Sequence, residues 1–163
     1  WAGIHALVLE AADNFDAFRN TEGASLEADF KGRLNEIERL ELSLDPLLES
    51  RITRVRDRIR TNLEKTMDRA ALDEGRFEQE VLYYIEKMDV SEERTRLKAH
   101  IKYFQEIMET GVGQGKKLGF VTQEMGREIN TLGSKANDAN LQRIVVQMKD
   151  ELEKIKEQVL NVL

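Results

Sequence analysis

Seven apolar residues near the end of the chain recur at alternating four- and three-residue steps without a slip. A mean period of 3.5 residues is that of a coiled-coil seam, in which a second helix covers one helix face along its length. The segment therefore predicts a long helix that needs a partner, either another helix of this chain or another subunit. The seven residues are Leu141, Val145, Met148, Leu152, Ile155, Val159 and Val162.

The rest of the chain also has the composition of long helices. One proline, 34% charged residues and 6% aromatic residues are typical of such chains, and no clean strand-like alternation occurs. We predict an all-α fold: a long antiparallel helical arm plus a small helical domain with a C-terminal coiled-coil-like helix. The arm is expected over residues 1–75 as a helical hairpin, and the C-terminal helical domain over residues 76–163.

Within the arm, the first helix is expected from Ile4 to Leu44, and Asp45 and Pro46 favour a helix restart because both suit a first turn. The second helix should pack antiparallel on the first, and residues 70–75 should form a loop. The second helix is expected to bury one apolar stripe, which comprises Leu48, Ile52, Val55, Ile59, Leu63 and Met67.

Two shorter helices should follow, one around Phe77 and Val81 and the next around Leu97 and Ile101. The run GVGQGKK, which starts at Gly111, predicts a loop. A helix is then expected from Lys116 to Leu132, with a break at Gly133 and a cap at Asn137 or Asp138 before the last helix.

The composition also excludes several classes of function. The 31 acidic and 25 basic residues give a net charge of −6, so a nucleic-acid role requires a local basic patch. The absence of cysteine removes disulfides, thiolate nucleophiles and Cys-type zinc sites, and suits a reducing compartment. No apolar run is long enough to span a bilayer, so we expect no membrane contact. Because the first residue is Trp1, the chain is expected to be a processed product or part of something longer.

The most basic segment is RITRVRDRIR, which starts at Arg51. Arg51, Arg54 and Arg58 lie three and four residues apart and so share one helix face that is suited to RNA phosphates. The alternative is a solvated face that pairs with acidic neighbours.

A second candidate is the glycine-rich loop that ends at Lys116 and Lys117, just before a helix. Glycines let backbone N–H groups approach an anion, and lysines add charge at the helix N-terminus. The sequence is not a P-loop, and an ordinary flexible connection is the alternative.

The third candidate is the polar face of the following helix, where Glu124 and Glu128 lie one turn apart with Arg127 beside them. Two such carboxylates can share a divalent cation, and an arginine can neutralise phosphate charge. An exposed face of paired charges is the alternative. Amide, hydroxyl and amine side chains extend this polar surface, including Gln123, Asn130, Thr131, Ser134 and Lys135.

His100, on the preceding expected helix, is a candidate proton shuttle or metal ligand, or else an ordinary half-buried histidine.

The segment GKKLGFVTQEMGREINTLGSKANDA, which starts at Gly115, resembles the C-terminal domain of the YicC/YloC family of bacterial endoribonucleases. The resemblance is specific from about Phe77 to the end. An upstream set and a closing set of residues also resemble the family pattern: Glu92, Glu93, Arg96 and His100, and Lys156, Glu157, Gln158 and Asn161.

The resemblance implies an all-α C-terminal portion whose family N-terminal domain is absent, and metal-dependent RNA cleavage by a cytoplasmic homo-oligomer, commonly a hexamer. Glu124 and Glu128 would hold Mg²⁺ or Mn²⁺ without any organic cofactor, and His100 would contribute to cleavage. Arg127 and Lys135 would stabilise phosphate charge. RNA contacts are expected from Gln123, Asn130, Ser134, Lys116 and Lys117.

Two positions depart from the family pattern, which has Asp at Gly119 and Asn at Gly126. Either a ligand pair has been given up there, or the glycines let another backbone approach. The other function that we consider is a helical oligomerisation module that binds RNA or protein without chemistry of its own.

Overall fold

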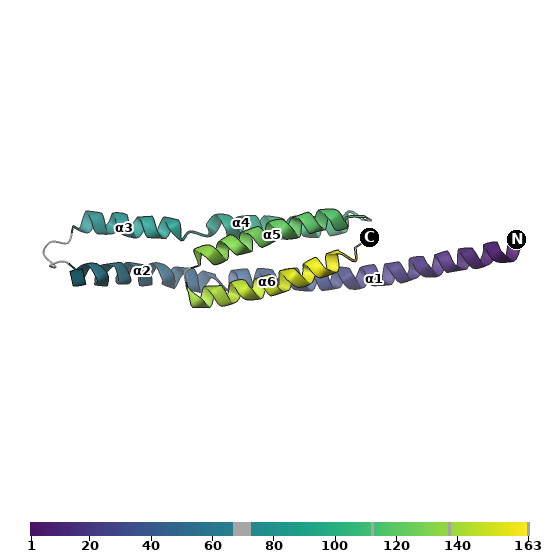
Figure 1. Cartoon of the computed structure of the whole chain (residues 1–163), viewed down its shortest axis with the longest axis horizontal. Helices are drawn as coiled ribbons and strands as arrows, with labels where there is room; N and C mark the ends of the chain where they lie inside the picture. The colour runs from purple at the N-terminus through teal and green to yellow at the C-terminus, as the bar shows by residue number, and fades with distance from the viewer. Residues whose placement is uncertain (67–72, 112, 137, 163) are drawn as a thin grey trace.

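The computed structural model describes residues 1–66, 73–111, 113–136 and 138–162, and no strand occurs within these ranges. Six helices account for nearly all of them, so the all-α prediction is confirmed (Figure 1). They are α1 (Ala2–Leu42), α2 (Asp45–Thr66), α3 (Glu74–Lys87), α4 (Ser91–Glu109), α5 (Gly115–Lys135) and α6 (Ala139–Val159).

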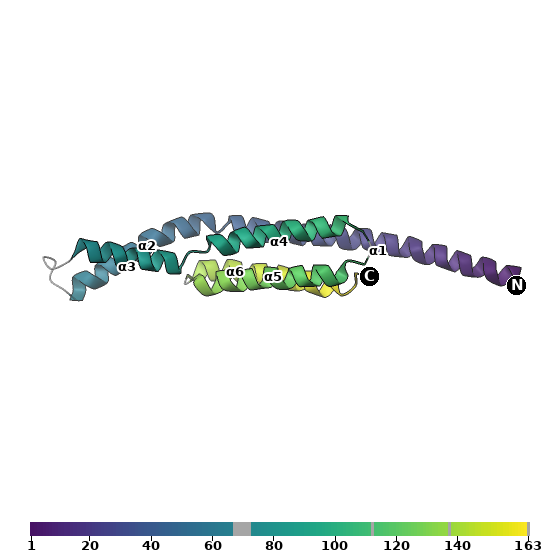
Figure 2. The same cartoon turned by 90° about the horizontal axis from the view of Figure 1, so that it is seen from above.

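The main core is a four-helix bundle made of α4, α5, α6 and the second half of α1. Helix α4 packs on α5, α5 on α6, and α1 on both α6 and α4, which closes a square of four helices (Figures 1 and 2). Because apolar stripes from all four helices meet inside, the bundle has one continuous interior. Its fully buried side chains include Leu34, Ile37, Leu97, Ile101, Phe104, Met125, Ile129, Leu132, Leu141 and Met148.

The coiled-coil seam of α6 is closed within the chain. Its six helical members are buried against α5 and α1, with Leu141 and Met148 fully covered. Val162, the seventh, lies beyond the helix end and is partly buried against the core. The partner that the heptad pattern requires is therefore another part of the same chain.

The prediction that the second helix packs antiparallel on the first is wrong. Only Ser43 and Leu44 separate α1 from α2, and Ser43 keeps a right-handed helical backbone conformation. The chain therefore bends slightly and continues, so that α2 extends the line of α1 beyond the bundle (Figure 1). Of the expected second stripe, Ile52 is 47% exposed, and Met67 lies outside the described residues.

Helix α2 instead pairs with α3, and the two form an arm at one end of the bundle (Figures 1 and 2). Ile59, Phe77 and Val81 make a small separate core there. The guanidinium groups of Arg56 and Arg60 lie 5.6 and 4.8 Å from the Phe77 ring centre, where cation–π attraction adds to the packing. Residues 70–72 of the predicted loop lie outside the described residues; Asp73 caps α3, and Glu74 and Gly75 are helical rather than part of a loop.

Both predicted boundaries of α5 are corrected. The helix begins at Gly115, so Lys116 and Lys117 are helical, and it continues through Gly133 to Lys135. Gly133 lies so close to α6 that an added Cβ would be 2.9 Å from Val145 Cγ1. The close packing of α6 explains why a glycine here is helical and buried.

The two positions that depart from the family pattern face the same neighbour. A Cβ on Gly119 would lie 3.9 Å from Val159, and one on Gly126 would lie 3.5 Å from Leu152, both ordinary contacts. Neither glycine is therefore required by a close backbone approach, and both lie on the α6 side of α5.

The sequence predicted Asn137 or Asp138 as the N-cap of α6. Asn137 lies outside the described residues, and the structure shows that Asp138 is the cap. Its carboxylate accepts hydrogen bonds from the backbone N–H groups of Asn140 and Leu141 at 2.9 and 3.3 Å. Burial opposes ionisation of Asp138, but these hydrogen bonds and Arg54 outweigh it and lower its pKa below the ordinary 3.8.

We expect Asp138→Ala to lower the free energy of unfolding by about 1 kcal/mol at neutral pH, because α6 loses its cap. Since the pKa is lowered on folding, this contribution is present above the ordinary carboxyl pKa and is lost as the pH falls through the lowered value. Urea denaturation of both proteins at neutral and acidic pH checks this, with the exposed Asp150→Ala as the control. An equal loss in Asp150→Ala would contradict a capping role.

Within the described ranges, no helix is both long and apolar enough to cross a membrane.

Candidate active site

Charged side chains line the outer edge along which α4 and α5 meet. We call this edge the α4–α5 seam. On α4, Glu93, Arg96 and His100 lie three and four residues apart, with Glu92 next to Glu93, and the members on α5 lie four and seven residues apart. Each set therefore lies on one helix face. The seam comprises Glu92, Glu93, Arg96, His100, Glu124, Glu128 and Lys135.

Two ion pairs fix how the helices are aligned along this seam. Lys135 Nζ lies 2.8 Å from a Glu93 carboxylate oxygen, and Arg96 Nη1 lies 4.0 Å from Glu128 Oε1. Helices α4 and α5 run in opposite directions (Figure 2). One turn forward from Arg96 and one turn back from Glu128 therefore put His100 and Glu124 at the same level along the seam, although the sequence assigns them to separate helices.

Glu124 and Glu128 differ in environment although they are one turn apart. The Glu124 side chain is 41% exposed and pairs with Arg127 at 3.2 Å, whereas the Glu128 side chain is 10% exposed. Arg96, which pairs with Glu128, also donates a hydrogen bond to Glu92. The seam thus holds one accessible carboxylate and one that is largely enclosed by the neighbouring helix.

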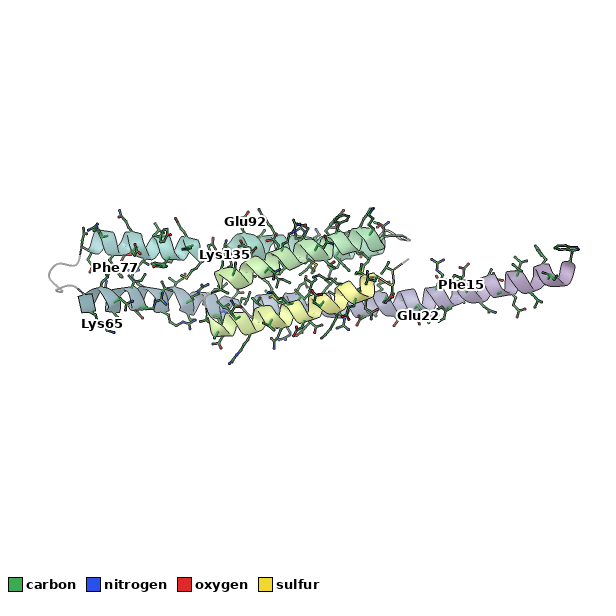
Figure 3. All side chains as sticks on the ribbon, viewed as in Figure 1. Phe15, Glu22, Lys65, Phe77, Glu92 and Lys135 are labelled. Atoms are coloured by element: carbon green, nitrogen blue, oxygen red, sulfur yellow. The ribbon has the colours of Figure 1, made fainter. Side chains whose placement is uncertain are left out.

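Lys135 anchors the end of the seam next to the α2–α3 arm, where Glu92 and Lys135 are labelled in Figure 3. Its ammonium pairs with Glu93, which is 6% exposed, and its carbonyl accepts a 2.6 Å hydrogen bond from Arg51. Burial lowers the pKa of Arg51. Removing one partner from such a buried set leaves an uncompensated charge, so these contacts hold α2, α4 and α5 together.

The predicted arginine stripe on α2 has three different environments. Arg51 is buried, Arg54 pairs with Asp138 at 2.9 Å, and Arg58 is exposed. Among the described residues, no ion pair involves Arg58. The alternative reading, pairing with acidic neighbours, therefore describes Arg54, while Arg58 remains available to a phosphate.

The remaining predicted RNA contacts lie on other parts of α5. Lys116 and Lys117 are exposed in its first turn, at the opposite end from Lys135. Gln123 and Asn130 are exposed and lie toward the α6 side. Ser134 is exposed and donates a hydrogen bond to the Thr131 carbonyl at 2.9 Å. Glu124, Arg127 and Glu128 thus lie on adjoining turns of α5, with His100 at the level of Glu124 on α4, whereas the other polar residues are spread around the helix.

The seam offers few ligands for a divalent metal ion. No group of three or more His, Cys, Asp or Glu side chains that could hold an ion occurs in the described parts of the chain. Mg²⁺ commonly uses only one or two carboxylates, with water and substrate phosphate oxygens completing its shell. Glu124 and Glu128 fit that limited role, but not a preformed metal cage.

The ion pairs that align the seam were not predicted. Arg96 and Glu93 entered the sequence interpretation only through the family resemblance, and neither was assigned a role. The sequence does contain a signal for these ion pairs. Arg96 and Glu93 share one helix face with Glu92 and His100, and two adjoining helices would each have such a polar face, here beside that of Glu124.

These features define a helical protein with a mixed acidic and basic seam along one edge of a four-helix bundle. A family model described as "Endoribonuclease YicC-like, C-terminal" matches residues 44–163, which include α2 to α6 and the whole seam. The chain belongs to the YicC-like endoribonuclease family.

Two curated relatives are similar over nearly the whole chain, and both bear the name "Probable endoribonuclease YicC". The protein from Clostridioides difficile (strain 630) is 35% identical over 166 residues, which cover 99% of this chain and 56% of the relative. The one from Haemophilus influenzae (strain ATCC 51907 / DSM 11121 / KW20 / Rd) is 32% identical over 152 residues, 91% of this chain and 51% of the relative. This chain therefore spans about half the length of the relatives it matches.

Proposed function

We propose that this chain carries the reactive surface of an endoribonuclease that cleaves RNA phosphodiester bonds in bacterial RNA turnover in the cytoplasm. The proposal is supported most strongly by the alignment of α4 and α5, from which we infer that His100 and Glu124 lie at the same level of the seam, with Arg127 beside Glu124. An acid–base side chain, a carboxylate and a phosphate-binding cation are the groups that phosphodiester hydrolysis uses.

In this proposal each side chain acts on the phosphate or near it. His100 exchanges protons with the attacking and leaving oxygens, and Glu124 holds the metal ion that is proposed below. Arg127 is 73% exposed and can turn from Glu124 toward a phosphate oxygen. Lys116 and Lys117 hold the RNA backbone at the start of α5, and Arg58 holds it on α2. Gln123, Asn130, Ser134 and Lys135 orient the RNA or the carboxylates.

We propose that Mg²⁺ or Mn²⁺ takes part, with Glu124 and Glu128 as its protein ligands. Bound there, the ion would supply a more acidic water or polarise the scissile phosphate. Glu128, enclosed beside Arg96, provides a fixed carboxylate, and Glu124 provides an accessible one. Since two carboxylates form an incomplete shell, the ion should bind well only together with RNA.

The proposal is tested by incubating the purified chain with an end-labelled, partly structured RNA in Mg²⁺, in Mn²⁺ and in EDTA. We expect cleavage in either metal and none in EDTA. Equal cleavage in EDTA would contradict the metal role. Absence of cleavage in all three conditions would contradict a reaction carried by this chain alone.

The second candidate is a helical module that binds RNA or protein without chemistry. The observation that favours it is the absence of a three-ligand metal group from the described parts of the chain. RNA binding in EDTA together with no cleavage in either metal would select this candidate.

We also propose a homo-oligomer, of which the hexamer expected from the family resemblance is one form, in which a second copy covers the first part of α1. This part of α1 projects beyond the bundle (Figure 1). Its exposed apolar residues continue the same helix face that is buried further along, at Phe30 and Ile37. A groove of about 750 Å³ lies where α1 leaves the bundle. The residues on this face are Ile4, Leu7, Val8, Phe15 and Phe18, and Leu9 is exposed on another face of the helix.

We expect the double change Phe15→Glu and Phe18→Glu to reduce the oligomer to a smaller species, because charges would enter the apolar face of α1. Sedimentation velocity at micromolar concentration measures this. Exposed Val146 on α6 gives the control, Val146→Glu, whose assembly should be unchanged. A strictly monomeric wild-type chain would contradict the proposed assembly.

A further inference from the structure

Two large aromatic side chains border the α4–α5 seam on its solvent side. Tyr103 on α4 is 51% exposed and Phe120 on α5 is 60% exposed. The two ion pairs of the seam align α4 with α5, and this alignment puts Tyr103 and Phe120 at facing positions. Both lie one turn further from the α2–α3 arm than His100 and Glu124. They are therefore neighbours of the proposed reactive groups.

Both rings lack an aromatic or cationic partner in the described parts of the chain. The ring pairs there are Phe30 with Phe104 and Tyr83 with Tyr84. Cation–π contacts are made by the rings of Phe15, Phe77 and Tyr83. The faces of Tyr103 and Phe120 are thus open to a ligand, and keeping such rings in water gives the fold little benefit.

On the side away from Glu124, the neighbours of the two rings are cationic. Lys116 and Lys117 lie three and four residues before Phe120, are exposed, and form no ion pair within the described residues. The first turn of α5 holds no acidic residue, and its N-cap, Gln114, makes no side-chain capping hydrogen bond. The charges of the two lysines and the positive end of the helix dipole repel each other. An anion bound nearby would relieve this repulsion.

We propose that Phe120 and Tyr103 form a stacking platform for unpaired nucleobases of single-stranded RNA, with Lys116 and Lys117 holding the adjoining phosphates. Open ring faces next to cationic side chains are how proteins bind single strands, because every base has a face to stack. Paired bases hide those faces, so the platform selects unpaired segments over duplex. This inference rests on the proposed function, since the platform would lead the strand to His100 and Glu124.

A second copy of the chain fits this face less well than the first part of α1. Phe120 and Tyr103 are two separate rings bordered by lysines, whereas the first part of α1 offers several exposed large apolar residues. Charge complementarity with a polyanion therefore favours RNA here.

The test uses the whole chain in EDTA and a short oligoribonucleotide that carries 2-aminopurine, alone or annealed to its complement. We expect the fluorescence of the single strand to be quenched on binding, with much weaker binding of the duplex. Phe120→Leu should raise the single-strand Kd about tenfold, and Phe120→Trp should restore it. Tyr103→Leu should act in the same direction. The matched control is Tyr83→Leu, an equally exposed tyrosine on α3.

Each result decides the proposal separately from the proposed function. Unchanged affinity of Phe120→Leu, or equal affinity for duplex, would overturn the platform, even if the wild-type chain cleaves RNA in Mg²⁺. Quenching that Phe120→Leu loses would support the platform, even if no cleavage occurs. A change in oligomer size with unchanged RNA affinity would assign the face to a second copy instead. Circular dichroism of each variant checks that its helices are intact.

Discussion

Replacing Glu124 by Gln should lower the rate of RNA cleavage by about 100-fold or more, because the seam loses its accessible carboxylate. Gln has nearly the same shape as Glu but cannot take up a proton or neutralise a cation at neutral pH. The effect should appear at saturating RNA, since the change removes chemistry rather than binding.

The fold should tolerate this change. Glu124 is 41% exposed, and its ion pair with Arg127 is a surface i,i+3 contact that contributes little to stability. The matched control is Glu153→Gln, which removes an equivalent exposed i,i+3 pair with Lys156 on α6. Cleavage should persist in that control. Cleavage at the wild-type rate in Glu124→Gln would place the chemistry elsewhere in the molecule.

The faces of the helices could be predicted from the sequence, because a 3.6-residue period is a local property. The stripe of α6 and the shared face of Glu124 and Glu128 are examples, and both are present in the structure. Local chemistry also predicted an α6 cap at Asn137 or Asp138, and Asp138 caps the helix.

The partners of those faces could not be predicted in the same way. The stripe of α2 specifies that one face is covered, but two residues between α1 and α2 decide whether the chain reverses or continues. Nothing local to α5 predicted that Gly133 would be helical, because its environment is set by Val145 of α6. Likewise, facing positions of His100 and Glu124 depend on the alignment of two helices, which the pairs Glu93–Lys135 and Arg96–Glu128 set.

A buried carboxylate near the end of α1 is an interhelical contact that we expect to contribute strongly to stability. Glu41 is 1% exposed and accepts a hydrogen bond from Arg94 Nε on α4. Lys98 Nζ of the same helix lies 3.1 Å from its other oxygen, and Arg94 also reaches Asp45 of α2 at 2.7 Å. Burial opposes the charge on Arg94, but its bonds to Glu41 and Asp45 outweigh this and raise its pKa. The cluster therefore joins α1, α2 and α4 through compensated charges.

We expect Glu41→Gln to lower the free energy of unfolding by about 3 kcal/mol, because Arg94 would keep its largely enclosed charge with only Asp45 to balance it. Urea denaturation followed by circular dichroism measures the loss, and the matched control is Glu36→Gln, which breaks an exposed pair with Arg39 on the same helix. The control should unfold near the wild-type midpoint, since surface pairs contribute little. If both variants unfolded at the same urea concentration, the Glu41 cluster would be no more stabilising than a surface ion pair, and packing of Leu34 and Ile37 alone would hold α1 to the bundle.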